Sequence, residues 1–136
     1  MKIKLDEYGI MPERAHATDA GIDIKTPQSF TIFGNCGCAI RTGVHIELPK
    51  GTCGLMVSKS GLNVKSGITS TGLIDEGYTG EIVVKLYNDS PNAYHFKKGD
   101  KITQLVIIPV LYEPLELSTE IDGGARGNDG FGSTGR

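Results

Sequence analysis

Apolar and polar residues alternate, or form short apolar runs, along most of this chain. The runs are rich in β-branched and aromatic side chains, and Gly, Asn and Pro separate them at short, even spacing. Helical periodicity is nearly absent, and one short helix is expected to begin within residues 58–62. The pattern predicts an all-β sandwich or barrel. Strands are expected at residues 2–5, 29–33, 39–48, 53–57, 82–87 and 101–111, with a further strand start within residues 15–24.

The glycine-rich stretch from residue 72 to residue 88 carries the most specific pattern. An apolar triplet leads into Asp75, an acidic turn follows, and a β-branched strand comes next. This order predicts a β-hairpin with one carboxylate, Asp75, and one aromatic ring, Tyr78, near its turn. An ordinary tight turn with an incidental acidic residue is the alternative. Positive φ and close backbone approach, which a hairpin lining a small pocket needs, are permitted by Gly72, Gly77 and Gly80.

Residues 58–62, with the sequence Ser-Lys-Ser-Gly-Leu, lie at the expected strand-to-helix junction. Such a segment can present backbone N–H groups and a cation to a phosphate. It is not a P-loop, because Cys53 and Ser58 occupy positions that the P-loop pattern gives to glycine. The segment alone is therefore weak evidence for a phosphate site.

Two polar residues stand among apolar neighbours in expected strands. Asp23 lies between two isoleucines, and simple alternation would place its side chain on the opposite face of the strand. Gln104 puts an amide inside the apolar segment 101–111. Since a buried amide must be hydrogen-bonded, Gln104 either serves the structure or faces a ligand.

The final residues, 123–136, are dense in glycine and contain one aromatic residue, two hydroxyl residues and two arginines. Composition alone indicates a disordered tail. The same residue types also suit a mobile arm that stacks on a base and holds phosphates once a ligand is present. We expect a single domain, with a β core over residues 1–120 and an arm over residues 121–136.

Composition and charge exclude several function classes. A chain of 136 residues suits one domain that buries roughly two-thirds of its unfolded surface. The formal net charge of −2 leaves no broad basic surface for nucleic acid. No apolar run is long enough to cross a membrane and no signal pattern is present, so a cytoplasmic location is expected.

The three cysteines agree with a reducing compartment, because an odd and small number does not make a disulfide framework. Cys36 and Cys38 are separated by one residue, but the second Cys or His pair of a zinc site is missing. Small, partly buried thiols are the favoured interpretation.

Five motifs in this order resemble those of the trimeric dUTPase family. They cover nearly the whole chain: DAGIDI at 19–24, SKSGL at 58–62, GLIDEGYTGE at 72–81, GDKITQL at 99–105 and RGNDGFGSTG at 126–135. The resemblance implies a distorted, jelly-roll-like β subunit with one short helix, in a homotrimer whose active sites lie at subunit boundaries. It also implies hydrolysis of dUTP to dUMP and pyrophosphate with Mg²⁺ held on the triphosphate. This reaction limits uracil in DNA and supplies dUMP for dTMP synthesis.

The resemblance also assigns roles by motif position. Asp75 would orient and deprotonate the water that attacks the α-phosphorus, and Tyr78 would lie beneath the deoxyribose and exclude a 2′-hydroxyl. The hairpin backbone from about Thr69 to Asp75, with Gly72 and Ile74, would bond the uracil edge and leave no room for the methyl group of thymine.

Further positions match the phosphate side of the family's site. No protein side chain is expected to bind Mg²⁺ directly, and Asp23 matches a carboxylate near the phosphates and metal. Phe131 of the arm would stack on uracil, while its other residues would hold the γ-phosphate. The segments expected to contact phosphates contribute Lys59, Ser60, Gly61 and Gln104, and the arm contributes Arg126, Phe131, Gly132, Ser133 and Thr134.

Three positions depart from the common family pattern. Many relatives carry Arg where Lys59 stands, and Lys cannot make the same bidentate fork. Asp129 replaces a common glycine in the arm and brings negative charge toward the triphosphate. Thr69 stands where some relatives use a side-chain amide on uracil, so base recognition here is expected to use the main chain.

Two other functions fit part of the pattern. A dCTP deaminase of the same fold would need a general acid or base Glu in the base pocket and would lack the Phe-Gly-Ser-Thr arm, which this chain has. A nucleotide-sensing regulatory protein would be expected to have lost Asp75, Tyr78 or Phe131, and all three are present.

Overall fold

The computed structural model describes residues 1–121 and 123–124. This part of the chain is all-β with one short helix, as the hydrophobic pattern predicts, and every strand pair is antiparallel. Its elements are β1 (Lys2–Leu5), β2 (Ile22–Lys25), β3 (Phe30–Ile32), β4 (Cys36–Arg41), β5 (Val44–Glu47), β6 (Thr52–Val57), α1 (Ser60–Ser66), β7 (Ile68–Ile74), β8 (Val83–Asn88), β9 (Tyr94–Phe96) and β10 (Lys101–Pro109).

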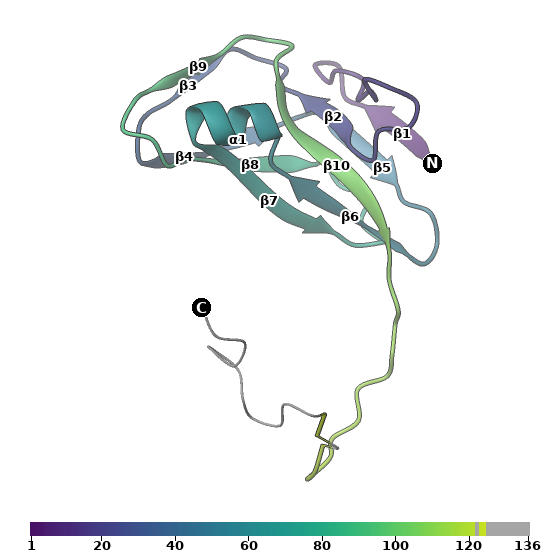
Figure 1. The fold of residues 1–136 in the computed structure, drawn as a ribbon. Helices are drawn as coiled ribbons and strands as arrows, with labels where there is room; N and C mark the ends of the chain where they lie inside the picture. Colours follow the sequence, from purple (N-terminus) through teal and green to yellow (C-terminus); the bar gives the residue numbers. More distant parts are fainter. Residues whose placement is uncertain (122, 125–136) are drawn as a thin grey trace.

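Three antiparallel sheets enclose one apolar core (Figure 1). The main sheet has six strands in the order β2-β10-β6-β7-β8-β4, and two smaller sheets pair β1 with β5 and β3 with β9. Side chains from all three sheets meet in the core and exclude water from it. Among the innermost are Ile24, Val44, Leu86, Phe96 and Leu105.

Three strand boundaries differ clearly from those expected, and one of them is the start of β4, which lies at Cys36 rather than at residue 39. The segment 39–48 is not one strand, because the chain turns at Gly43, whose φ of +67° favours glycine. The last strand ends at Pro109 rather than at residue 111, and proline cannot donate a hydrogen bond to a neighbouring strand. The short strand β9 had no clear signal in the sequence.

The expected short helix is α1, which follows β6. It ends at Ser66 and is capped by Gly67, which has a φ of 65° and whose N–H bonds the carbonyls of Asn63 and Leu62. None of its residues is fully buried, so α1 lies on the outside of the sheet, and Leu62 packs against the core. No helix in the described ranges has the length and apolar character that crossing a bilayer requires.

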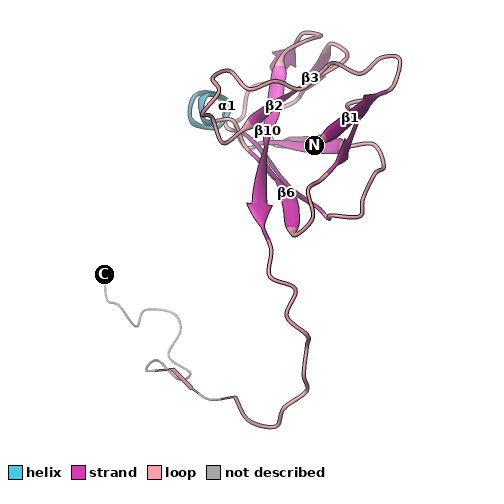
Figure 2. Cartoon of the chain, turned by 90° about the vertical axis from the view of Figure 1, so that its right-hand side faces the viewer, coloured by secondary structure: helices cyan, strands magenta, loops and turns pink. Residues whose placement is uncertain are grey.

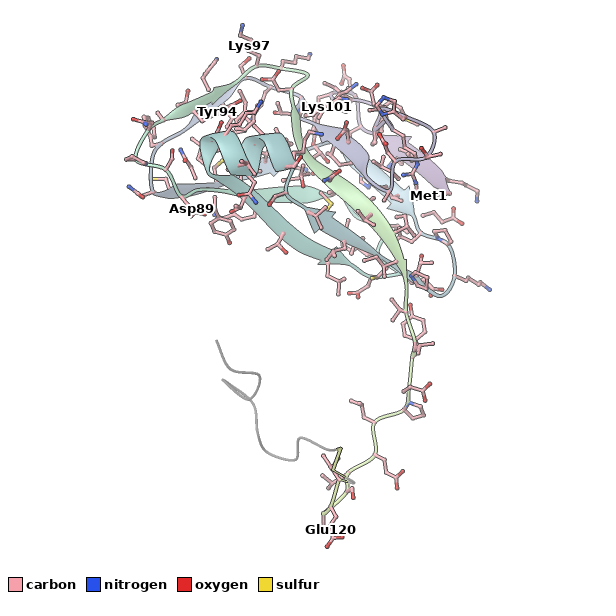
Figure 3. The ribbon with its side chains drawn as sticks, viewed as in Figure 1. Met1, Asp89, Tyr94, Lys97, Lys101 and Glu120 are labelled. Atoms are coloured by element: carbon pink, nitrogen blue, oxygen red, sulfur yellow. The ribbon has the colours of Figure 1, made fainter. Side chains whose placement is uncertain are left out.

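Beyond β10 the chain leaves the sheet as an extended segment, and both views show this departure (Figures 1 and 2). Side chains along this segment are exposed, including Leu111, Leu115 and Leu117. Figure 3 shows that side chains project from this segment along its length to Glu120. The segment carries the chain from the β core toward the predicted arm.

Candidate active site

The hairpin of β7 and β8 opens toward its turn. The two strands pair only at Ile68–Asn88, Thr69–Tyr87 and Ser70–Leu86. Beyond these pairs β7 remains bonded to β6, and β8 remains bonded to β4. The hairpin strands therefore diverge and leave a cavity of about 240 Å³ between them. Main-chain N–H and C=O groups on this edge of β7 have no partner on β8, and they can bond a ligand.

Four of the predicted site residues line this cavity: Gly72, Ile74, Asp75 and Tyr78. Thr69 does not, because it lies inside the paired part of the hairpin, one residue before the strands diverge. The remaining lining comes from β6, from both hairpin strands and from the end of the turn, and consists of Met56, Ser70, Thr71, Leu73, Glu81, Ile82, Val83, Val84 and Lys85.

Asp75 and Tyr78 are held together by the turn. The Tyr78 N–H donates to the Asp75 carbonyl at 3.0 Å, and the Tyr78 hydroxyl donates to the Glu81 carbonyl at 2.9 Å. The tyrosine ring is about half exposed, and Asp75 is exposed. A carboxylate in this position can accept a proton from a water molecule at the mouth of the cavity.

The positive φ suggested for the three hairpin glycines is wrong. Among the described residues, positive φ occurs at other glycines, and neither Gly72 nor Gly77 nor Gly80 has it. Gly80 is required instead for close approach, because a Cβ there would lie 2.5 Å from atoms of the Tyr78 ring. The missing side chain thus lets the ring fold back over the turn.

Glu81 anchors the end of the turn to the rest of the molecule. Its carboxylate accepts hydrogen bonds from the Arg41 guanidinium at 2.6 Å, from the Tyr8 hydroxyl at 2.7 Å and from the Gly43 N–H at 2.9 Å. Burial raises the pKa of this carboxyl, but the hydrogen bonds from Arg41, Tyr8 and Gly43 outweigh burial and lower the pKa to about 2.

His45, on β5, also holds this turn in place through its side chain. One ring nitrogen, Nδ1, lies 2.9 Å from the Thr79 carbonyl, and Nε2 lies 3.2 Å from Oδ1 of Asp6. Both partners are acceptors, so the protonated ring satisfies both contacts. The Thr79 carbonyl and then Asp6 raise the pKa of His45 accordingly.

A second group of predicted residues gathers around a buried carboxylate. Asp23 is only 5% exposed, and its two oxygens lie 2.5 Å from the Lys59 ammonium and 2.7 Å from the Lys101 ammonium. Figure 3 labels Lys101 at the start of β10. Burial raises the pKa of Asp23, but the hydrogen bonds from Lys101 and Lys59 prevail and leave this pKa below its usual range. Alternation along β2 does not by itself predict this burial between two lysines.

The other candidates for phosphate contact lie near this ion pair. Lys59 and Gly61 line a second cavity of about 510 Å³, and Ser60 is the exposed first residue of α1. Gln104 donates from Nε2 to the Ser58 carbonyl at 3.2 Å, so its amide serves the structure by holding the segment that leads into α1. No residue lines both this cavity and the hairpin cavity.

Buried hydroxyls connect the two groups. The Ser58 hydroxyl donates to the Ser70 carbonyl at 3.1 Å and accepts from the Ser70 N–H at 2.9 Å. The Ser70 hydroxyl lies 2.7 Å from that of Thr103, which donates to the Val57 carbonyl. Because buried polar groups are costly unless paired, this network fixes β6, β7 and β10 relative to one another.

Residues 7–135 match the family model described as dUTPase. The chain belongs to the dUTPase family. It is 42% identical over 132 residues to the deoxyuridine 5′-triphosphate nucleotidohydrolase of Tropheryma whipplei (strain Twist), an alignment that covers 94% of this chain and 90% of that protein.

Solved dUTPase structures are also similar to this chain. The Staphylococcus bacteriophage 80alpha dUTPase with dUPNHPP aligns with a TM-score of 0.91 and 31% identity, over 99% of this chain and 98% of that one. A variant of the dUTPase from phage phi11 of S. aureus, described with a structural Mg(II) ion, aligns with a TM-score of 0.80 and 29% identity, over 88% of this chain and 96% of that one.

This dUTPase is a dUTP diphosphatase, an enzyme of nucleotide metabolism that hydrolyses dUTP. The family, the activity and the jelly-roll-like all-β fold indicated by the five motifs are therefore confirmed. These matches favour dUTP hydrolysis over the dCTP deaminase and nucleotide-sensor alternatives.

The predicted arm residues of the dUTPase lie outside the described part of the chain. These are Arg126, Phe131, Gly132, Ser133 and Thr134, together with the departure at Asp129. Their roles stay predictions.

Sequence reasoning missed the residues that anchor the site. Lys101 lies inside the motif GDKITQL, and Glu81 is the last residue of the motif GLIDEGYTGE. Both motifs contain other residues with a predicted role, but no role was predicted for Lys101 or Glu81. Their partners come from distant parts of the chain: Asp23 for Lys101, and Arg41 and Tyr8 for Glu81. Only the folded structure brings these groups together.

Proposed function

We propose that Asp75 is the general base of this dUTPase and deprotonates the water that attacks the α-phosphorus of dUTP in line, releasing pyrophosphate and leaving dUMP. One observation carries the proposal: Asp75 is an exposed carboxylate at the mouth of the cavity between the diverging hairpin strands, beside Tyr78. Phosphoryl-type transfer needs positioning and charge neutralisation more than covalent chemistry, so one well-placed base suits it.

The nucleoside half of the substrate is assigned to the same cavity. Its volume of about 240 Å³ is below the roughly 300–1,000 Å³ of pockets for drug-sized ligands, which suits a base and sugar without the phosphates. The unpaired edge of β7, with Gly72 and Ile74, offers main-chain groups to the uracil edge. The ring of Tyr78 lies under the deoxyribose and leaves no room for a 2′-hydroxyl. Thr69 contributes at most through its main chain.

The phosphates are assigned to the second group of residues, in which Lys59, Ser60 and Gly61 would contact the phosphates and Gln104 would hold the segment that leads into α1. Mg²⁺ reaches the site on the triphosphate and supplies charge neutralisation there. The donor set fits a metal carried by the substrate, because lysines already engage both oxygens of Asp23 and no group of three or more candidate ligands occurs in the described residues. Asp23 would then orient Lys59 near the phosphates without binding the metal.

A homotrimer with shared sites accounts for the separation of the two groups. The hairpin cavity and the cavity at Lys59 and Gly61 have no lining residue in common. One dUTP molecule must nevertheless contact both the general base Asp75 and the phosphate-binding residues. Placing the hairpin of one subunit against the phosphate-binding segment of another would complete a site. The arm, residues 121–136 beyond the β core 1–120, would then close over it. A cytoplasmic location, which the three free cysteines favour, remains a prediction.

Replacing Asp75 by asparagine tests the proposal directly. D75N keeps the size and polarity of the side chain but removes the base, and a general base typically contributes about 10²–10⁴-fold. We expect kcat for dUTP to fall by about that factor while dUTP binding persists. The matched control is D89N, because Asp89 is also an exposed aspartate beside a strand end and lines neither cavity. Turnover of D75N close to that of D89N would remove Asp75 from the mechanism.

A further inference from the structure

Glu76, the residue after Asp75, makes contacts that its turn does not need. The turn is already closed by the hydrogen bond from the Tyr78 N–H to the Asp75 carbonyl. The half-buried Glu76 carboxylate instead reaches two other parts of the chain. Its Oε2 accepts a hydrogen bond from the Gly51 N–H at 2.8 Å and another from the Tyr112 hydroxyl at 2.9 Å.

Gly51 connects this contact to the exit of the last strand. It lies in the turn before β6 with a φ of +73°, a conformation that favours glycine. Its carbonyl accepts a hydrogen bond from the Val110 N–H at 2.9 Å, and Val110 directly follows β10. The turn before β6 and the end of β10 lie side by side, because Thr52 of β6 pairs with Pro109 of β10 (Figure 1).

Three segments therefore meet at one carboxylate. They are the catalytic turn at Glu76, the turn at Gly51, and the start of the C-terminal segment at Val110 and Tyr112. Hydrogen bonds to an ionised acceptor are stronger than neutral ones, and the two donors lower the pKa of Glu76, with Gly51 contributing most and Tyr112 next. The carboxylate is thus in the charged form that both hydrogen bonds favour at neutral pH.

We propose that Glu76 and Tyr112 are positioning residues for dUTP hydrolysis, which together fix the main chain that carries Asp75 and the point at which the C-terminal segment leaves the β core. We call the contact of Glu76, Gly51 and Tyr112 the clasp. This inference rests on the proposed role of Asp75 as the base. Through the clasp, the direction in which the C-terminal segment departs is coupled to the orientation of the base.

The clasp has a physical reason to matter for catalysis. Asp75 is exposed, and no side chain in the described residues bonds its carboxylate, so its direction depends on the main chain of the turn. A general base must stay within hydrogen-bond reach of the water that it deprotonates. A small displacement of catalytic groups is expensive, and about 1 Å can cost on the order of 100-fold.

The test is steady-state kinetics of Y112F, which removes only the hydroxyl that donates to Glu76. We expect kcat for dUTP to fall on the order of tenfold, because the turn that carries Asp75 loses one anchor. The matched control is Y87F, since the Tyr87 hydroxyl makes no hydrogen bond in the part of the chain that the structure describes and Tyr87 lines neither cavity. Y87F should keep the parent kcat.

Two combined variants separate a positioning role from a merely structural one. In an E76A background the Y112F change should have no further effect on kcat, because both side chains belong to one contact. In a D75N background Y112F should also leave the residual kcat unchanged, because the clasp acts through the base. Additive losses in either background would overturn the inference.

The remaining outcomes are equally decisive. A lower melting temperature for Y112F with unchanged kcat and KM would make the clasp a stabilising contact only, and would overturn the proposal. Failure of the underlying function is distinguishable, because it would appear as full activity in D75N itself, whatever Y112F does. A loss of kcat in Y112F and E76A that disappears in D75N supports the clasp.

Discussion

The position of the Tyr78 ring depends on the absence of a side chain at Gly80. The ring folds over Gly80, and its hydroxyl is fixed by the Glu81 carbonyl. A tyrosine held at both ends of its side chain is a rigid wall, which is what exclusion of a 2′-hydroxyl requires. Discrimination between dUTP and UTP should therefore depend on Gly80 as much as on Tyr78.

The variant G80A tests this dependence. The new Cβ would lie 2.5 Å from atoms of the Tyr78 ring, closer than any real contact allows, so the ring must move. We expect the ratio of kcat/KM for dUTP to that for UTP to fall on the order of tenfold. G77A is the matched control in the same turn, because a Cβ at Gly77 meets no atom within 4 Å. An unchanged ratio in G80A would show that the ring does not set sugar specificity.

At this scale the sequence predicts residues whose contacts come from their own turn. It misses residues whose contacts come from segments far away in the sequence. Asp75 and Tyr78 were predicted to share a turn because the glycines and the acidic pair around them define that turn, and both line the cavity. Alternation along its strand does not predict the surroundings of Asp23, which is buried between Lys59 and Lys101. Two cations from other elements reverse the usual preference of a carboxylate for water.

At the scale of elements, the hairpin is defined by how its strands separate. The sequence predicts both strands and the turn, because β-branched runs flank a Gly-rich acidic stretch. It does not predict that the β7–β8 pairing stops after Ser70, because that depends on β6 and β4 retaining their own partners. The cavity is thus a property of the whole six-stranded sheet.

The turn itself is held from outside the hairpin, most strongly at Glu81. The pKa of Glu81 falls from an ordinary 4.5 to about 2, so the ionised carboxylate stabilises the folded state above about pH 4.5. That contribution is lost as the pH falls toward 2, where the folded protein must also take up the proton. The pH dependence of stability should therefore carry a component from this residue.

Chemical denaturation of E81Q at several pH values measures that component. At pH 7 we expect E81Q to lower the free energy of unfolding by about 2 kcal/mol, since it weakens hydrogen bonds to a charged acceptor. The difference from the parent protein should shrink as the pH falls from 4.5 toward 2. E47Q is the control, because exposed Glu47 pairs with Lys2 at the surface and such pairs are worth about 0–1 kcal/mol. A deficit in E81Q that is constant with pH would contradict the assignment.

At the scale of the whole molecule, the predicted site is divided. The residues predicted to bind uracil and to act as the base line one cavity, while Lys59 and Gly61 line another, and the predicted arm follows a segment that extends away from the sheet (Figures 1 and 2). The motif order could indicate the family but not this separation, because the placement of motifs in space follows from the sheet order. We infer that neither catalysis nor substrate closure is complete within one chain.

The measurement that tests this account most directly is complementation between two inactive variants. One is D75N, which keeps the arm but lacks the base, and the other is a chain ending at residue 125, which keeps Asp75 but lacks the arm from Arg126 onward. Each alone is expected to have very low turnover, because the first lacks proton transfer and the second lacks closure over the phosphates.

The two chains are co-expressed with different affinity tags, and mixed oligomers are isolated by purification on both tags and verified by native mass spectrometry. If the arm of one subunit closes over the Asp75 of another, the mixed oligomers contain complete sites and hydrolyse dUTP well above either parent. If base and arm of one site belong to the same chain, no complete site can form. Mixed oligomers as inactive as their parents, or a protein that forms no oligomer, would contradict the account.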